Sequence, residues 1–235
     1  MNFSQAIGTA ALAGAALLAA PAVAQDTAPP KAVTVTATIG GVSDYRFRGV
    51  SLSGEEPAVQ GSIEASHQSG FYGGVWASTL GDAGGADVEV DLYGGWAGDL
   101  GSTAVDVGVL GYVYPDGSDL DYLELYGSAG WSLGPAMATL GVNYAPDQKN
   151  VGGRDNLYVY GDLSAGIPTT PVTLRAHLGY EDGPFAGPDG DKLDWSIGAD
   201  YALGAFTIGV AYVDTDLEGF DEADAGVLFS LTASF

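Results

Sequence analysis

Short segments in which apolar and polar side chains alternate make up most of the chain beyond residue 32. In the final ten residues, one face of an extended chain carries Val227, Phe229, Leu231, Ala233 and Phe235, and the opposite face is mostly polar. A period of two residues is typical of a β-strand with two different surroundings on its two faces. This stretch alone fits both a strand between lipid and a wet lumen and an edge strand of a soluble sheet.

Twelve segments carry this strand-like pattern. Most are close to the roughly 9 to 11 residues that a tilted strand needs to cross a bilayer. The predicted strands are residues 33–45, 57–68, 71–80, 87–98, 103–114, 120–132, 136–145, 155–167, 171–181, 192–203, 205–214 and 225–235.

The connections between these segments alternate in character. Longer, acidic links rich in Gly and Pro are expected at residues 47–56, 81–86, 115–119, 146–154, 182–191 and 215–224. Tight turns are expected at residues 69–70, 99–102, 134–135, 168–170 and 204. Long loops at one end and short turns at the other are typical of an antiparallel up-and-down membrane barrel. The fold class predicted is therefore all-β, a transmembrane antiparallel β-barrel of about twelve strands.

The clearest segment fixes which face meets lipid. In residues 193–203, Leu193, Ile197 and Tyr201 share one face, whereas Asp194 and Asp200 share the other. A charged side chain facing lipid near the bilayer midplane is destabilising by up to a few kcal/mol, so the apolar face must point outward. Aromatic residues of outward parity gather near both ends of the segments, as membrane-interface girdles do. They are Tyr144, Tyr180, Trp195 and Tyr212 near the long links, and Trp131, Tyr201, Phe206 and Phe235 near the turns.

The same parity collects charged side chains inside the predicted barrel. These pore-lining candidates are Arg46, Glu64, Glu89, Asp91, Asp106, Glu124, Asp162, Arg175, His177, Asp194 and Asp200. Because carboxylates in a pore favour cations, an acidic lumen predicts a cation-preferring channel. The alternative is that these acids form a hydrogen-bonded plug with inward Tyr112, Tyr126, Tyr160, His177 and Arg175, since a twelve-stranded barrel lies between filled small barrels and open porins.

Composition narrows the classes of function. Thirty acidic residues against seven basic ones give a formal net charge of −23, so a nucleic-acid partner is not expected. There are no cysteines, so packing and hydrogen bonding alone must hold an exported chain together. No apolar run beyond the N-terminal segment reaches the ~20 residues of a spanning helix, which leaves a closed sheet as the route into a bilayer.

The N-terminal segment predicts export. Residues 1–24 have an apolar core followed by a small-residue cleavage pattern and are expected to be a signal peptide, although Lys and Arg are missing before the core. Residues 25–32 are expected to be a periplasmic leader, and residues 33–235 the barrel.

Three stretches resemble a known family. They are residues 42–50 (Val-Ser-Asp-Tyr-Arg-Phe-Arg-Gly-Val), 56–64 (Glu-Pro-Ala-Val-Gln-Gly-Ser-Ile-Glu) and 67–78 (His-Gln-Ser-Gly-Phe-Tyr-Gly-Gly-Val-Trp-Ala-Ser). The chain here resembles the TorF family of porin-like proteobacterial outer-membrane proteins, and the resemblance is specific over residues 38–78 and looser onward to Phe235. It implies a barrel in the outer membrane with a passive transport role, and it supplies no substrate or catalytic residue.

The first of these stretches also has a physical interpretation. Asp44, Arg46 and Arg48 share parity at the outer end of the first predicted strand, where an acid can pair with the arginines. Either the cluster holds the first loop at the barrel rim, or it forms a basic constriction facing carboxylates of other strands. We expect the loop at residues 49–56 to fold partly inward over the mouth.

Other chemistry receives little support from the sequence. Only His67 and His177 could serve as imidazole bases, and neither lies beside a recognisable nucleophile motif, so no enzyme activity is expected, with an outer-membrane lipid hydrolase as the weakest alternative. The acidic loops do not have calcium-loop spacing, so no metal and no cofactor are expected. The partners expected are outer-membrane lipid and the barrel-assembly machinery, through the strand that ends at Phe235. Homo-oligomers, and a barrel that only tethers the envelope, both stay open.

Overall fold

The computed structural model describes most of the chain. The described residues are 32–83, 85–115, 117 and 119–235. The predicted signal peptide, residues 1–24, and all of the predicted leader except Ala32 lie outside them.

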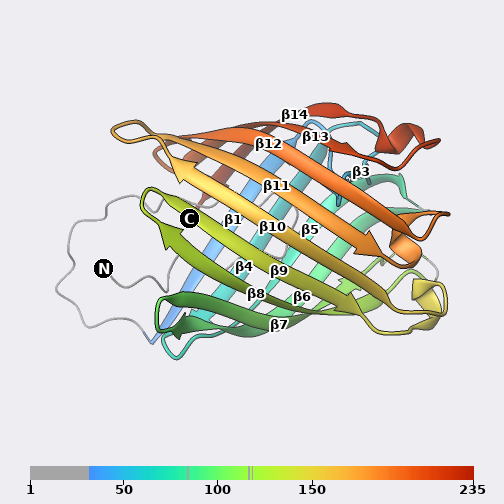
Figure 1. Cartoon of the computed structure of the whole chain (residues 1–235), viewed down its shortest axis with the longest axis horizontal. Helices are drawn as coiled ribbons and strands as arrows, with labels where there is room; N and C mark the ends of the chain where they lie inside the picture. The colour runs from blue at the N-terminus through green and yellow to red at the C-terminus, as the bar shows by residue number, and fades with distance from the viewer. Residues whose placement is uncertain (1–31, 84, 116, 118) are drawn as a thin grey trace.

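The described part of the chain folds into one closed antiparallel barrel of twelve strands (Figure 1). Each strand pairs with its neighbour in the chain, and the barrel closes where the first strand pairs with the last, from Thr38 opposite Ser234 to Val42 opposite Ser230. The strands are β1 (Val33–Val42), β4 (Ala58–His67), β5 (Phe71–Ala83), β6 (Ala86–Leu100), β7 (Thr103–Val113), β8 (Tyr122–Leu133), β9 (Ala136–Ala145), β10 (Asn156–Gly166), β11 (Val172–Asp182), β12 (Asp191–Leu203), β13 (Phe206–Thr215) and β14 (Gly226–Ser234). The predicted fold class and strand number are confirmed.

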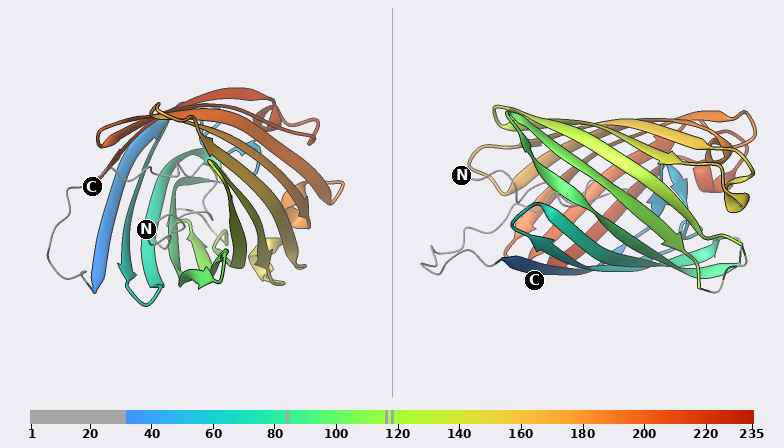
Figure 2. Two further views of the ribbon diagram at one scale, coloured as in Figure 1. Left: turned by 60° about the vertical axis from the view of Figure 1, so that its left-hand side comes forward. Right: turned by 90° about the horizontal axis from the view of Figure 1, so that it is seen from below.

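Short turns and long loops separate to opposite ends of the barrel. In Figure 1 the turns and the C-terminus lie at the left, and the loops that carry short helical segments lie at the right. Those segments are η2 (Lys149–Val151), η3 (Pro184–Ala186) and η4 (Asp221–Ala223). Figure 2 shows the tilted strands winding around one common axis. The predicted alternation of connections is therefore confirmed.

Two predicted boundaries are wrong. The link expected at residues 81–86 is much shorter, because β5 continues to Ala83 through an irregular register and β6 starts at Ala86. The first strand ends at Val42 and not at residue 45, so Asp44, Arg46 and Arg48 belong to the following loop. That loop contains a small hairpin of its own, formed by β2 (Arg46–Phe47) and β3 (Val50–Ser51).

Apolar side chains cover the outside of the barrel. Ile197 in the middle of β12 is 65% exposed, and Leu92, Leu174, Leu178 and Phe229 on other strands are also exposed. A barrel wall this apolar is unfavourable in water and is the surface that a hydrocarbon layer requires. The outward parity predicted from the sequence is confirmed, and the fold is a transmembrane barrel. Among the described residues, no helix is long and apolar enough to cross a membrane.

The predicted aromatic girdles are present at both ends. Tyr144, Tyr180 and Tyr212 are exposed near the loops, and Tyr201, Phe206 and Phe235 are exposed near the turns. The Tyr144 hydroxyl donates to Asp155 at 3.1 Å, and the Tyr212 hydroxyl donates to Asp214 at 2.7 Å. Rings with a polar tip suit the membrane–water interface. The other two predicted members, Trp131 and Trp195, are half-buried.

Candidate functional site

The loop between β1 and β4, residues 43–57 and called L1 below, folds into the mouth of the barrel. Its residues 44–53 are mostly buried, whereas Glu55 and Glu56 are exposed. The inward fold was predicted, but for residues 49–56; the inserted part starts five residues earlier. The reason is that the hairpin β2–β3 is short and has Arg48 at its turn, where the side chain reaches partners on the barrel wall.

Arg48 connects L1 to two strands of the barrel wall, β8 and β11. Its guanidinium lies 2.7 Å from the Glu124 carboxylate on β8 and 2.5 Å from the Glu181 carboxylate on β11. Glu181 also accepts from Lys192 on β12, and Glu124 accepts from Tyr112 and Asn143. Burial alone would lower the pKa of Arg48, but the two carboxylates outweigh it and raise the pKa well above its ordinary value. The residue therefore stays charged in the lumen.

Aromatic rings complete the surroundings of Arg48. The guanidinium carbon lies 4.5 Å from the centre of the Phe47 ring and 4.3 Å from that of Tyr158. Such cation–π contacts are worth about 2 kcal/mol or more when they are shielded from water. Arg48 also has a φ of +49°, a left-handed conformation that is uncommon outside glycine. The carboxylates on β8 and β11 thus hold the backbone of L1 in an unusual conformation.

A second arginine fastens L1 to itself and to the loop between β13 and β14. The Arg46 Nε atom lies 2.6 Å from Asp44 Oδ2, and Arg46 also donates to the backbone carbonyl of Asp224. Asp44 accepts from Ser51 at 2.5 Å and from Ser53 at 3.2 Å. Both hypotheses for this cluster therefore describe part of it: Arg46 holds the loop near the rim, and Arg48 faces carboxylates of other strands.

Hydrogen-bonded side chains fill the half of the lumen that is enclosed by β4 to β8. Tyr45 of L1 donates to Glu89 at 2.7 Å, and Tyr114 donates to the same carboxylate at 2.6 Å. Burial, together with the Glu89 and Asp91 carboxylates, raises the pKa of Tyr45 well above its ordinary value, so the hydroxyl keeps the proton that it donates.

Deeper in this half, Tyr72 donates to Asp106 at 2.5 Å and Tyr93 donates to Glu64 at 3.2 Å. Asp91 is fully buried, and neither of its oxygens has a hydrogen-bond partner among the described residues. This half of the lumen therefore resembles the hydrogen-bonded plug that the sequence left open as an alternative to a pore.

Tyrosine rings in the lumen lie over glycines of neighbouring strands. A side chain added at Gly141 would meet the Tyr160 ring at 2.2 Å, and one added at Gly108 would meet Tyr126 at 2.3 Å. Both pairs are direct neighbours across adjacent strands. Glycine leaves the space that lets a large ring lie flat against the wall. The tyrosine rings therefore fill part of the lumen and do not block all of it.

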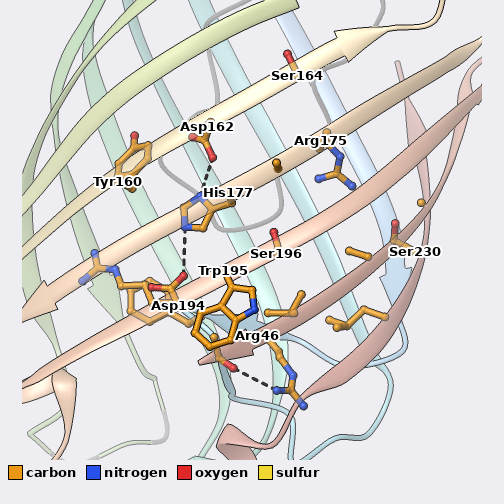
Figure 3. A pocket seen from close by; sticks show the side chains of 18 of the residues that line it. Arg46, Tyr160, Asp162, Ser164, Arg175, His177, Asp194, Trp195, Ser196 and Ser230 are labelled. Atoms are coloured by element: carbon orange, nitrogen blue, oxygen red, sulfur yellow. Dashed lines mark hydrogen bonds and ion pairs between the residues drawn. The ribbon is translucent and has the colours of Figure 1, made fainter. Parts of the chain in front are cut away.

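The other half of the lumen is hollow. A cavity of about 260 Å³, called the chamber below, extends from L1 to Met137 and Ser164 near the turn end of the barrel. Its wall comes mainly from β8 to β14, as the close view in Figure 3 shows in part. The polar lining includes Asp44, Arg46, Arg48, Gln60, Ser128, Thr139, Asn143, Tyr158, Tyr160, Asp162, Ser164, Arg175, His177, Asp194, Ser196 and Ser230.

His177 lies between two carboxylates on the chamber wall. Its Nδ1 atom is 2.7 Å from Asp162, and its Nε2 atom is 3.2 Å from Asp194 and 2.7 Å from the Tyr158 hydroxyl (Figure 3). The Asp162 side chain is 38% exposed, whereas that of Asp194 is 4% exposed. Nearer the turns, Arg175 contacts Asp200 through two nitrogens at 2.6 and 2.8 Å. Acidic and basic side chains therefore lie next to one another along the chamber wall.

The structure places all eleven predicted pore-lining side chains inside the barrel or in L1. Five lie on the wall of the chamber, namely Arg46, Asp162, Arg175, His177 and Asp194. The other six lie away from it, and they are Glu64, Glu89, Asp91, Asp106, Glu124 and Asp200. Glu181, Lys192 and Tyr158 were not among the predicted site residues, and Arg48 was predicted only as a member of the cluster with Asp44 and Arg46. Their inward parity was visible, but no local pattern signals that one arginine reaches two strands.

His67 is exposed and contacts Ser69 near a turn, outside the lumen. Within the part of the chain that the structure covers, no group of three or more His, Asp or Glu residues could hold a metal ion.

Solved structures of similar shape share the fold of this chain. The NanC porin in a rhombohedral crystal form matches with a TM-score of 0.58 and 14% identity, over 85% of this chain and 98% of that chain. The KdgM porin in complex with disordered oligogalacturonate matches with a TM-score of 0.59 and 8% identity, over 86% and 98%. The protein therefore has the fold of an outer-membrane porin. No curated protein matches the sequence at a significant level.

A family model assigns the chain more closely. Residues 25–233 match the family described as "Bacterial protein of unknown function (Gcw_chp)", and the chain belongs to this family. The match covers all of the barrel strands except the last residue of β14.

Proposed function

We propose that the protein is an outer-membrane channel for the passive diffusion of small solutes or ions. The observation that carries this proposal is the chamber, which reaches from L1 at the loop end to Met137 near the turn end inside a closed, lipid-facing barrel. A wall of charged and hydroxyl side chains keeps such a space hydrated. The porin fold supports the same location and role, and so does the resemblance of residues 38–78 to the TorF family.

The channel prefers cations in this proposal. Ten carboxylates lie inside the barrel or in the inserted part of L1, and they are Asp44, Glu64, Glu89, Asp91, Asp106, Glu124, Asp162, Glu181, Asp194 and Asp200. The cationic side chains there are Arg46, Arg48, Arg175 and Lys192. An excess of carboxylates makes the interior potential negative, which attracts cations and repels anions.

A location in the outer membrane implies two partners in this proposal. Lipid contacts the apolar outer wall, and the strand ending at Phe235 is the segment through which the barrel-assembly machinery would recognise the chain. The proposal includes no catalytic step and no cofactor. Cross-linking of the membrane-embedded protein tests whether barrels associate.

A closed structural barrel is the second candidate. It is favoured by the inserted L1 and by the hydrogen-bonded tyrosines and carboxylates between β4 and β8, which together fill much of the interior. A barrel closed in this way would stabilise the envelope without conducting.

The test is a reversal potential measured on refolded protein in a planar bilayer under a potassium chloride gradient. We expect steady single-channel currents, and a reversal potential displaced toward the equilibrium potential of potassium. Displacement toward that of chloride would contradict the cation preference. Bilayers that contain folded barrel but carry no current would favour the structural barrel.

A further inference from the structure

The chamber contains two carboxylates whose capacity to accept hydrogen bonds is not used up by the protein. Asp194 is 3% exposed, and its Oδ2 atom has no hydrogen-bond partner among the described residues. Asp162 faces the same space from β10, with its side chain 38% exposed. A buried carboxylate oxygen without a donor is costly, so each such oxygen calls for an explanation.

His177 accounts for only part of this charge. It contacts one oxygen of Asp162 and one of Asp194, so even a protonated ring supplies one positive charge to two carboxylates. The Tyr158 hydroxyl, 3.2 Å from Asp194 Oδ1, adds a donor but no charge. At least one negative charge therefore stays unmatched on this part of the wall.

The arginines of the chamber are already paired. Arg175 holds Asp200 through two nitrogens, Arg46 holds Asp44, and Arg48 holds Glu124 and Glu181. An anionic solute would therefore meet arginines whose charge is already matched by a carboxylate. A cationic solute meets Asp162 and Asp194 without breaking any ion pair.

The protein itself shows how this wall accommodates a guanidinium group. Arg48 lies over the Tyr158 ring at 4.3 Å, and the Tyr158, Tyr160 and His177 rings contact one another in a triangle beside the two carboxylates. Planar N–H donors match carboxylate oxygens, and a flat cation is favoured beside aromatic rings.

We propose that the chamber holds a binding site for small solutes that carry a guanidinium or primary ammonium group, with Asp162 and Asp194 as the acceptors. This proposal names a class of solute for the proposed channel. It rests on the proposed function only in that solutes reach the site through the channel. Figure 3 shows both carboxylates on either side of His177 at the chamber wall.

The test is calorimetric titration of the folded barrel in detergent micelles, with methylguanidinium as the probe. Neutral methylurea and anionic acetate serve as matched probes. We expect binding of methylguanidinium alone, and a loss of affinity of about tenfold or more in Asp162→Asn, because a charge-assisted hydrogen bond is lost. Asp194→Asn should also bind methylguanidinium more weakly than the unmodified protein does.

The control variant is Asp189→Asn, which removes an exposed carboxylate from the loop between β11 and β12 and changes the net charge equally. It should bind as the unmodified protein does. Equal affinity in Asp162→Asn and the unmodified protein, or binding of acetate in preference to methylguanidinium, would overturn the proposal. If Asp194→Asn does not fold, Asp162→Asn decides, since its side chain is partly exposed.

This measurement separates the site from the channel. Calorimetry needs no current. Binding of methylguanidinium by a barrel that does not conduct would therefore support the binding site and refute the channel function. Conduction without methylguanidinium binding would retain the channel and refute the site.

Discussion

Replacing Arg48 by alanine is expected to release L1 from the lumen and to raise the single-channel conductance severalfold. The guanidinium lies between Glu124 on β8 and Glu181 on β11, and its residue is 5% exposed. Removing one partner of a buried ion pair typically costs about 3–5 kcal/mol, because the remaining charges lose their compensation. Withdrawal of L1 lets water reach both carboxylates, so loop release is the cheaper response.

Two further variants make this result specific. Arg48→Lys keeps the charge but lacks the planar fork that contacts two carboxylates at once, so we expect a conductance between those of the alanine variant and the unmodified protein. Arg154→Ala removes an exposed arginine from the loop between β9 and β10 and should leave the conductance unchanged. A destabilised Arg48→Ala barrel with unaltered conductance would show that L1 does not narrow the passage.

Replacing Gly81 by alanine should unseat L1 without removing any charge. A Cβ atom at Gly81 would lie 2.6 Å from the backbone carbon of Ser53 and 2.7 Å from its oxygen. Non-bonded carbon atoms normally stay about 3.5–4.0 Å apart, and backbone atoms cannot rotate away as a side chain does. The Gly81 N–H also donates to the Leu52 carbonyl at 2.9 Å, so the same contact holds the loop to β5. We expect the conductance to rise while the preference for cations is retained.

The matched control is Gly166→Ala in β10, because a Cβ atom there would meet nothing within 4 Å. Bilayer recordings of both variants should differ, with only the Gly81 variant conducting more. Because both substitutions act through L1, the double variant Arg48→Ala with Gly81→Ala should conduct no more than the larger single variant. A Gly81 variant that behaves as the Gly166 variant does would place the narrow point elsewhere.

The barrel itself could be predicted because the side that each strand residue faces depends only on its position in the alternating pattern. Alternation places Ile197 in lipid and Asp194 inside from their positions alone, and neither depends on a distant residue. The C-terminal strand shows the same logic, with Leu231 exposed and Ser230 on the chamber wall.

The site could be predicted only in part because its contacts join residues far apart in the chain. Arg48 and Glu181 are 133 positions apart, and nothing near either residue in the sequence indicates the other. Lys192 shares inward parity with Asp194, yet it was overlooked because its role depends on Glu181 across the β11–β12 pair. The glycines opposite tyrosines, such as Gly141 and Tyr160, become informative only when the register of neighbouring strands is known.

Accessibility of neighbouring positions on one strand tests the central claim most directly. Because the chain has no cysteine, single cysteines at Ile197 and Ser196 of β12 can each carry a nitroxide spin label on the barrel in lipid vesicles. At position 197 we predict strong relaxation of the label by oxygen, which dissolves in lipid, and weak relaxation by a water-soluble nickel complex. At position 196 we predict the reverse. Equal accessibility at both positions, or exclusion of both reagents from position 197, would contradict a wall with lipid outside and water inside.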